Sequence, residues 1–152
     1  MWDDLRVQVR GELRSLRDQA RLVIDRADAF RREPPDAWDL AAIGGLLHSH
    51  YVGVERVFRA IAADVDGWAP TGERWHADLL DMMRTVTPAR SAVISKDLAA
   101  SLGQYLGFRH VFRSSYPRQL DWKRIAPLVD DLERVDSLFA LEITEFLESL
   151  GA

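Results

Sequence analysis

The chain has 152 residues, 47% of them hydrophobic and 29% charged, which is the balance and the length of one globular domain, here residues 1–152. It has no cysteine, so disulfide bonds and thiolate chemistry are excluded. The net charge of −4 argues against a protein that coats nucleic acid without selectivity. The first residues do not resemble a signal peptide, and the longest uncharged apolar run, residues 40–47, is too short to span a membrane. We therefore expect a cytoplasmic protein that does not enter the membrane.

The first two predicted helices lie on either side of a proline pair. Apolar residues recur at alternating steps of four and three over residues 5–30, which predicts a long amphipathic helix. Pro34 and Pro35 end it, and Asp36 is the expected N-cap of a second helix with the same spacing over residues 40–65. Because each helical glycine costs up to about 1 kcal/mol, the glycines of this helix predict close approach of a neighbouring backbone. They are Gly44, Gly45 and Gly53.

Three further helices follow. A short one is predicted over residues 75–86, and Ser95 is the expected N-cap of a fourth that ends before Pro117. In the last helix, Pro127 is expected at the first helical position, which places Asp130 and Asp131 near the positive end of the helix dipole.

No segment alternates with a period of two for long enough to form a strand. The sequence therefore predicts an all-α fold, an antiparallel up-down bundle of four to five helices.

Charge is unevenly distributed near the C-terminus. Residues 109–124 carry five cations against one acidic residue, a net +4, whereas residues 130–148 carry a net −6. A basic stretch on an acidic protein is typical of a selective phosphate site. It is equally expected as the partner of an acidic neighbouring helix.

The basic stretch continues a stripe of the fourth helix that is apolar at its start and cationic at its end. The stripe contains Leu98, Leu102, Tyr105, Arg109, Arg113 and Tyr116. A buried Arg109 requires an anion, which can be a ligand phosphate, the carboxylate of Glu55 on the second helix, or the acidic last helix. If Glu55 meets Arg109 across the bundle, it positions the guanidinium.

The histidines do not form a metal site. His48 and His50 are two residues apart on a helix and therefore point roughly 200° away from each other. His76, at the start of the third helix, is expected to be a capped or surface histidine rather than a ligand. With four histidines and no cysteine, we expect no bound metal.

Residues 107–116, GFRHVFRSSY, resemble the signature of the HEPN superfamily, in particular the HepT-like toxins. The motif of that group is an arginine, four residues, a histidine, one residue and a tyrosine at the end of a bundle helix. Residues 48–58, 72–83 and 120–132 also resemble the group, in the same order along the chain. The resemblance implies a homodimer with facing motifs that cleaves RNA without a metal or other cofactor. It also implies a minimal nucleotidyltransferase antitoxin that adds AMP to the motif tyrosine.

By position, the motif of this chain is Arg109-x4-Ser114-x-Tyr116, with Tyr116 as the expected AMPylation target. Two further cations are candidate contacts to phosphate or RNA: Arg113 and Arg118. Ser114 stands where the family has its catalytic histidine. Loss of a general base costs on the order of 10²–10⁴ in rate, and an alcohol is a poor base near pH 7. We therefore expect ribonuclease activity to be reduced or absent, unless His110, four residues before Ser114 on the same helix face, takes the proton.

Two other hypotheses remain open. The chain can be a non-catalytic binding subunit that completes a minimal nucleotidyltransferase, since helical bundles of this type resemble the substrate-binding half of aminoglycoside nucleotidyltransferases. It can also be a helical dimer without a ligand, in which Arg109 simply pairs with Glu55.

Overall fold

The computed structural model describes residues 1–115 and 120–151, except for the side chains of residues 113–115. It contains α1 (Asp3–Arg32), α2 (Ala37–Ile61), a π-helical turn η1 (Ala62–Asp66), α3 (Trp75–Met83), α4 (Lys96–Ser115) and α5 (Trp122–Ser149). Residues 1–115 and 120–151 contain no β-strand. The predicted all-α fold is confirmed.

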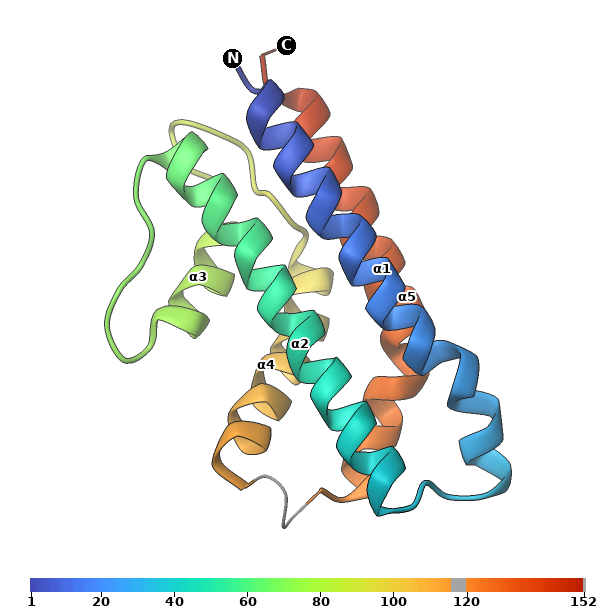
Figure 1. Ribbon diagram of the computed structural model, residues 1–152. Coiled ribbons are helices and arrows are strands. Elements are labelled where there is room, and N and C mark those ends of the chain that lie inside the picture. The colour runs from blue at the N-terminus through green and yellow to red at the C-terminus, as the bar shows by residue number, and fades with distance from the viewer. Residues whose placement is uncertain (116–119, 152) are drawn as a thin grey trace.

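Four long helices form a closed ring. α1 packs against α2 and α5, α4 packs against the other sides of α2 and α5, and the short α3 lies against α2 and α4. Figure 1 shows α1 and α5 side by side along their length, with the two chain ends close together. The apolar stripes of all five helices meet in one core. α2 contacts α1, α3 and α4.

The predicted N-caps are present. The side chain of Asp36 accepts a hydrogen bond from the backbone N–H of Asp39, whose own carboxylate accepts from the backbone of Asp36. The hydroxyl of Ser95 accepts from the backbone N–H of Leu98 at the start of α4. Each side chain satisfies a donor that the first helical turn leaves free.

The third helix ends at Met83, three residues earlier than predicted. Arg90 is buried beside it and donates to the carbonyl oxygens of Met82 and Thr85, at 3.1 and 2.8 Å. Asp66 neutralises the guanidinium through two contacts of 2.9 and 3.1 Å. Because the arginine occupies carbonyls at the helix end, the chain turns there instead of continuing to Val86, which is exposed.

The prediction for the start of α5 is wrong. Asp121, whose side chain accepts from the backbone N–H of Lys123, is the N-cap, so the helix begins at Trp122 and Pro127 lies inside it. The first turn consequently contains no acidic residue, and Asp130 and Asp131 lie beyond it. A proline this close to the N-terminus removes only one backbone hydrogen bond, and the core contacts of Ile125 and Leu128 hold the first turns in place.

Among the described residues, Asp130, Glu133 and Asp136 of α5 pair with arginines of α1, and Arg109 pairs with Glu55 instead of with α5. Arg17 contacts Glu133 at 2.9 Å and Asp136 at 3.2 Å. The other carboxylate oxygen of Asp136 lies 2.8 Å from Nε2 of His50, and both side chains are buried. This polar cluster joins α1, α2 and α5. Its carboxylates, Glu133 and Asp136, belong to the acidic helix that was a candidate partner of Arg109.

A neighbouring backbone was predicted to approach the glycines of α2, and this prediction is wrong. Gly44 and Gly53 face side chains instead. A Cβ atom at Gly53 would lie 2.5 Å from Cδ2 of Leu16 on α1, and one at Gly44 would lie 2.9 Å from the ring of Phe112 on α4. A Cβ atom at Gly45 would meet nothing within 4 Å. Two of the three glycines therefore receive core side chains from opposite neighbours of α2.

None of the helices within residues 1–115 and 120–151 combines the length and the apolar character that crossing a membrane requires.

The glycine geometry predicts opposite effects for two matched substitutions. Leu16 is buried, so moving its side chain away from a new methyl group would disturb the core, and Gly53→Ala should lower the free energy of unfolding by about 1–3 kcal/mol. Gly45→Ala, in the same helix, should leave it unchanged or raise it by up to about 1 kcal/mol, because the new methyl group has room. Urea unfolding followed by circular dichroism measures both values. Equal effects of the two substitutions would contradict the packing described for Gly53.

Candidate functional site

Three helices contribute one polar side chain each to a cluster where α2, α3 and α4 pack together. Glu55 comes from α2, His76 from the first turn of α3, and Arg109 from the C-terminal half of α4. Their side chains are 4%, 18% and 13% exposed, respectively. α3 is short, but it packs against both α2 and α4, and this places His76 between the other two residues.

The carboxylate of Glu55 holds the cluster together. Its Oε2 lies 2.6 Å from Nδ1 of His76, and its Oε1 lies 3.4 Å from Nε of Arg109. Nη1 of Arg109 lies 3.4 Å from Nε2 of His76, which closes the triangle. The contact with Oε1 is an ion pair without the alignment of a hydrogen bond, because Nε has no hydrogen-bond partner among the described residues.

Tyr51 lies one helical turn before Glu55, on the same face of α2. Its phenol is 1% exposed, and its hydroxyl has no hydrogen-bond partner among the described residues. Burial raises the pKa of this phenol well above its ordinary value; the negative charge of Glu55 raises it further, and Arg109 opposes the shift. Tyr51 therefore remains a neutral hydroxyl beside the charged cluster.

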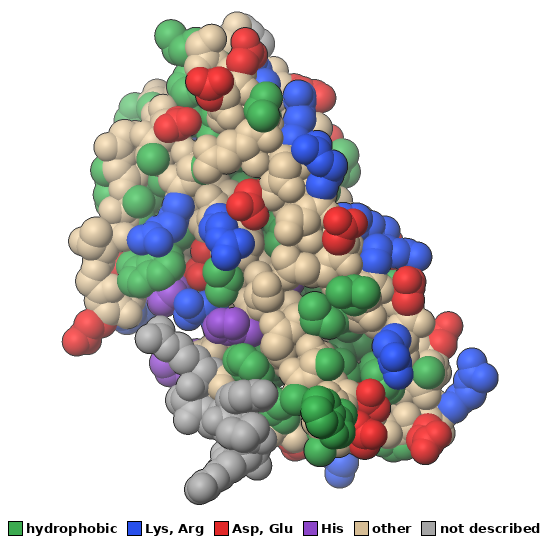
Figure 2. Space-filling model, viewed as in Figure 1, with side chains coloured by type: hydrophobic (Ala, Val, Ile, Leu, Met, Phe, Trp, Pro, Cys, Tyr) green, Lys and Arg blue, Asp and Glu red, His purple; other side chains and the backbone are tan. Residues whose placement is uncertain are grey.

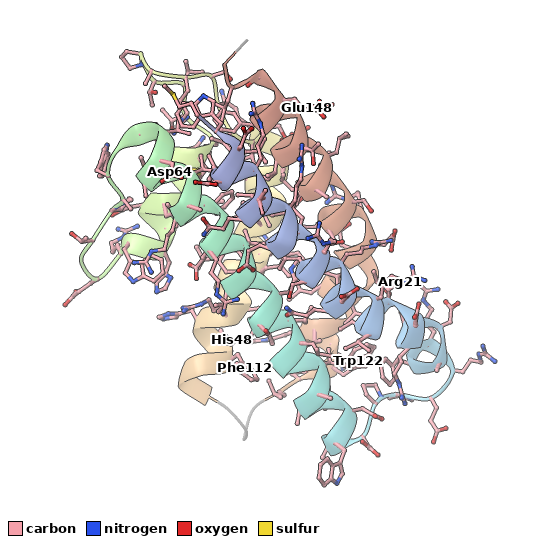
Figure 3. All side chains as sticks on the ribbon, turned by 45° about the horizontal axis from the view of Figure 1, so that its top comes forward. Arg21, His48, Asp64, Phe112, Trp122 and Glu148 are labelled. Atoms are coloured by element: carbon pink, nitrogen blue, oxygen red, sulfur yellow. The ribbon has the colours of Figure 1, made fainter. Side chains whose placement is uncertain are left out.

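Aromatic side chains hold the cluster from outside. The ring of Trp75 stacks on that of His76 with centroids 3.5 Å apart, and the guanidinium of Arg59 lies 4.3 Å from the centre of the Trp75 ring. On the adjacent part of α4, the ring of Phe112 lies 5.2 Å from that of His48, and Figure 3 shows these two side chains next to each other between α2 and α4.

The structure brings together two of the residues considered from the sequence and adds a third. Glu55 and Arg109 meet across the bundle as expected. His76, expected from the sequence to be a capped or surface histidine, is capped by the carboxylate of Glu55; its position beside Arg109 as well was not predicted. A signal was available in the sequence: His76 lies in one of the stretches, 72–83, that carry the family resemblance. Nothing in the spacing of a single helix, however, connects residue 76 with residue 55.

The remaining predicted residues are outside the cluster or outside the description. His110 is exposed on α4. Arg113 and Ser114 belong to α4, but their side chains are not described, and Tyr116 and Arg118 lie outside the described residues. Figure 2 shows histidine side chains gathered on one face, with Lys or Arg side chains beside them.

The other two histidines behave as their spacing predicts. His50 contacts Asp136 on α5, while His48 turns to Phe112 on α4, so the two rings have different neighbours. Within the part of the chain that the structure describes, no group of three or more His, Cys, Asp or Glu side chains could hold a metal ion.

The cluster combines two chemical capacities at one place. A guanidinium can bind a phosphate group and stabilise negative charge that develops on it. A neutral imidazole can accept a proton near pH 7. Glu55 contacts both groups and sets their separation.

The unpartnered hydroxyl of Tyr51 predicts a contrast with Tyr105, whose hydroxyl donates a 2.7 Å hydrogen bond to the carbonyl oxygen of Leu128. Tyr105→Phe should lower the free energy of unfolding by about 0.5–1.5 kcal/mol. Tyr51→Phe should leave it unchanged or raise it, because the substitution removes a buried polar group that lacks a partner. Chemical denaturation of both variants checks this, and a larger loss in Tyr51→Phe than in Tyr105→Phe would refute it.

Comparison with known proteins identifies a family. Residues 42–150 match the model of a family described as HepT-like protein, and this range contains Glu55, His76 and Arg109. Comparison with curated proteins and with solved structures found no match. The match covers more than half of the chain, and it agrees with the all-α bundle and with the resemblance carried by residues 107–116. This chain therefore belongs to the HepT-like protein family of the HEPN superfamily.

Proposed function

We propose that this chain is the toxin of a HEPN toxin–antitoxin pair and that it cleaves RNA, slowly and without a metal, at the site centred on Arg109. Family membership implies the toxin–antitoxin context. The observation that carries the proposal is the position of Arg109, a nearly buried guanidinium at the end of an apolar stripe, held by Glu55.

Arg109 is proposed to bind the phosphate at which the RNA is cut. The guanidinium offers several N–H donors and stabilises the extra negative charge on phosphorus when the 2′-oxygen attacks. Glu55 is proposed to orient the guanidinium, and its low exposure supports this role because a buried carboxylate keeps its partner in place. Arg113 and Arg118 are proposed as additional contacts to the RNA backbone. Ser114 cannot act as an efficient base, so the expected rate is low.

A homodimer with facing motifs is part of the proposal. Exposed apolar surface next to the motif supports it: Val111 is exposed, and a groove of about 660 Å³ between α4 and α5 is lined by Gly103, Gly107 and Phe108. Helices pack closely where glycines leave their backbones accessible, and a Cβ atom placed at Gly103 or Gly107 would meet no group of another element within 4 Å.

The proposed partner is a minimal nucleotidyltransferase antitoxin that transfers AMP to Tyr116. Each added phosphate would add negative charge to the proposed motif, where it would compete with RNA for the cations and repel the RNA backbone. Silencing by this modification needs no change in the fold.

Cleavage of RNA in the presence of EDTA tests the site. The unchanged chain should cut RNA slowly, Ser114→His should raise the rate, by at most about 10⁴-fold, and Arg109→Ala should abolish cleavage in either background. Arg14→Ala, which removes an exposed arginine of α1, is the matched control and should have no effect. Cleavage that survives Arg109→Ala would rule out the proposed site.

Modification by the antitoxin is tested by mass spectrometry. Incubation with the cognate nucleotidyltransferase and ATP should raise the mass of the chain in steps of one AMP, and Tyr116→Phe should prevent this. An adduct of the same mass on Tyr116→Phe would show that another residue is the acceptor. A stable complex with the transferase, without any adduct and without RNA cleavage by the chain or by Ser114→His, would favour the non-catalytic binding subunit.

A further inference from the structure

The hydrogen-bond partners of His76 determine which of its ring nitrogens carries the proton. The carboxylate of Glu55 only accepts hydrogen bonds, so Nδ1, 2.6 Å from Oε2, must donate. The guanidinium of Arg109 only donates, so Nε2, 3.4 Å from Nη1, must accept. The neutral ring is therefore protonated on Nδ1, and the lone pair of Nε2 faces the group that is proposed to bind phosphate.

The ring of His76 is also held in place, yet it remains accessible. Trp75 stacks against it, and Trp75 in turn is covered by the guanidinium of Arg59. The His76 side chain is 18% exposed, so a substrate can reach it, whereas Glu55 behind it is only 4% exposed. A carboxylate in this position keeps an imidazole in one tautomer and stabilises the imidazolium that forms when the ring takes a proton.

We propose that His76 is the general base of the RNA cleavage reaction and takes the role of the motif histidine, whose position is occupied by Ser114 in this chain. This inference rests on the proposed ribonuclease function. Nε2 of His76 takes the proton of the 2′-hydroxyl, the 2′-oxygen forms a bond to phosphorus, and the bond from phosphorus to the 5′-oxygen breaks. The 5′-oxygen leaves with a proton from water, and a 2′,3′-cyclic phosphate remains. Arg109 turns from Nε2 to the phosphate when RNA binds, which frees the lone pair next to the attacking hydroxyl.

The other histidines fit this role less well. His50 has a carboxylate partner, Asp136, but both are buried between α2 and α5, where RNA cannot reach them. His110, the candidate from the sequence, is exposed on α4. His76 combines three features: a buried carboxylate on one ring nitrogen, an arginine of the motif at the other, and an exposed edge.

The decisive experiment compares single-turnover RNA cleavage in EDTA by the unchanged chain, His76→Gln and His110→Gln. A glutamine amide can still donate to Glu55, but it cannot take a proton near pH 7. His76→Gln should lower the cleavage rate by about 10²-fold or more while the affinity for RNA, measured with a non-cleavable 2′-deoxy substrate, stays the same. A rate that is unchanged in His76→Gln, or a loss in His110→Gln alone, overturns the proposal.

A second base, introduced at the motif position, separates this inference from the function on which it rests. Ser114→His in the His76→Gln background should restore cleavage, which would also show that His76→Gln is folded. If the unchanged chain cuts slowly, Ser114→His cuts faster and His76→Gln leaves the slow rate unchanged, the proposed function stands and the role of His76 is refuted. If neither the unchanged chain nor Ser114→His cuts RNA, both the proposed function and the role of His76 are refuted.

A measurement on the unchanged chain tests the geometry without any substitution. Long-range ¹H–¹⁵N correlation spectra distinguish the two neutral tautomers of each of the four histidines. His76 should be the Nδ1-protonated form. An Nε2-protonated ring would leave no lone pair facing Arg109 and would exclude His76 as the base.

Discussion

Glu55 places a carboxylate in the interior at the point where α2, α3 and α4 meet, and an unpaired charge at that depth would destabilise the fold by several kcal/mol. The carboxylate is compensated only if Arg109 and His76 both reach it. This requirement fixes how α4 is rotated and where the short α3 lies against its two neighbours. The two contacts that compensate the buried charge of Glu55 also bring a guanidinium and an imidazole together.

Pairing of a buried charged or polar side chain with a partner on another element recurs elsewhere in the described part of the chain. The buried charged or polar side chains there are His50, Glu55, Arg90 and Asp136. Each has a partner of opposite or complementary character: His50 with Asp136, Glu55 with Arg109 and His76, and Arg90 with Asp66. Losing one member of such a pair costs far more than the pair contributes, because a buried charge remains behind. Buried pairs of this kind therefore specify which helix faces which, while the apolar stripes supply most of the free energy of folding.

Function and packing are separated along α4. Its N-terminal part, from Leu98 to Tyr105, is a core stripe, and the hydroxyl of Tyr105 is bonded to α5. Its C-terminal part carries Arg109, the first residue of the proposed motif, two residues before the exposed Val111.

Much of the fold could be predicted from local patterns. The three-four spacing of apolar residues, the proline pair at 34 and 35, and the N-caps Asp36 and Ser95 all act within one or two turns, and the structure agrees with them. The start of α5 was predicted wrongly because Pro127 is tolerated a turn and a half inside the helix, where Asp121 caps the true beginning. The glycines were attributed to a close backbone, but which atom fills the space at Gly53 depends on α1.

By itself, the sequence predicted a bundle of four to five helices and the helix faces that are buried, because these follow from periodicity at fixed spacing. The motif Arg109-x4-Ser114-x-Tyr116 stays a prediction from family resemblance. The sequence also named Glu55 as a candidate partner of Arg109, since Arg109 continues the apolar stripe of its helix and therefore needs an anion near the core. Only the tertiary structure decided that His76 joins them. That contact depends on the angle at which a nine-residue helix, reached through a turn and a loop, packs on two others, and no local pattern encodes this angle.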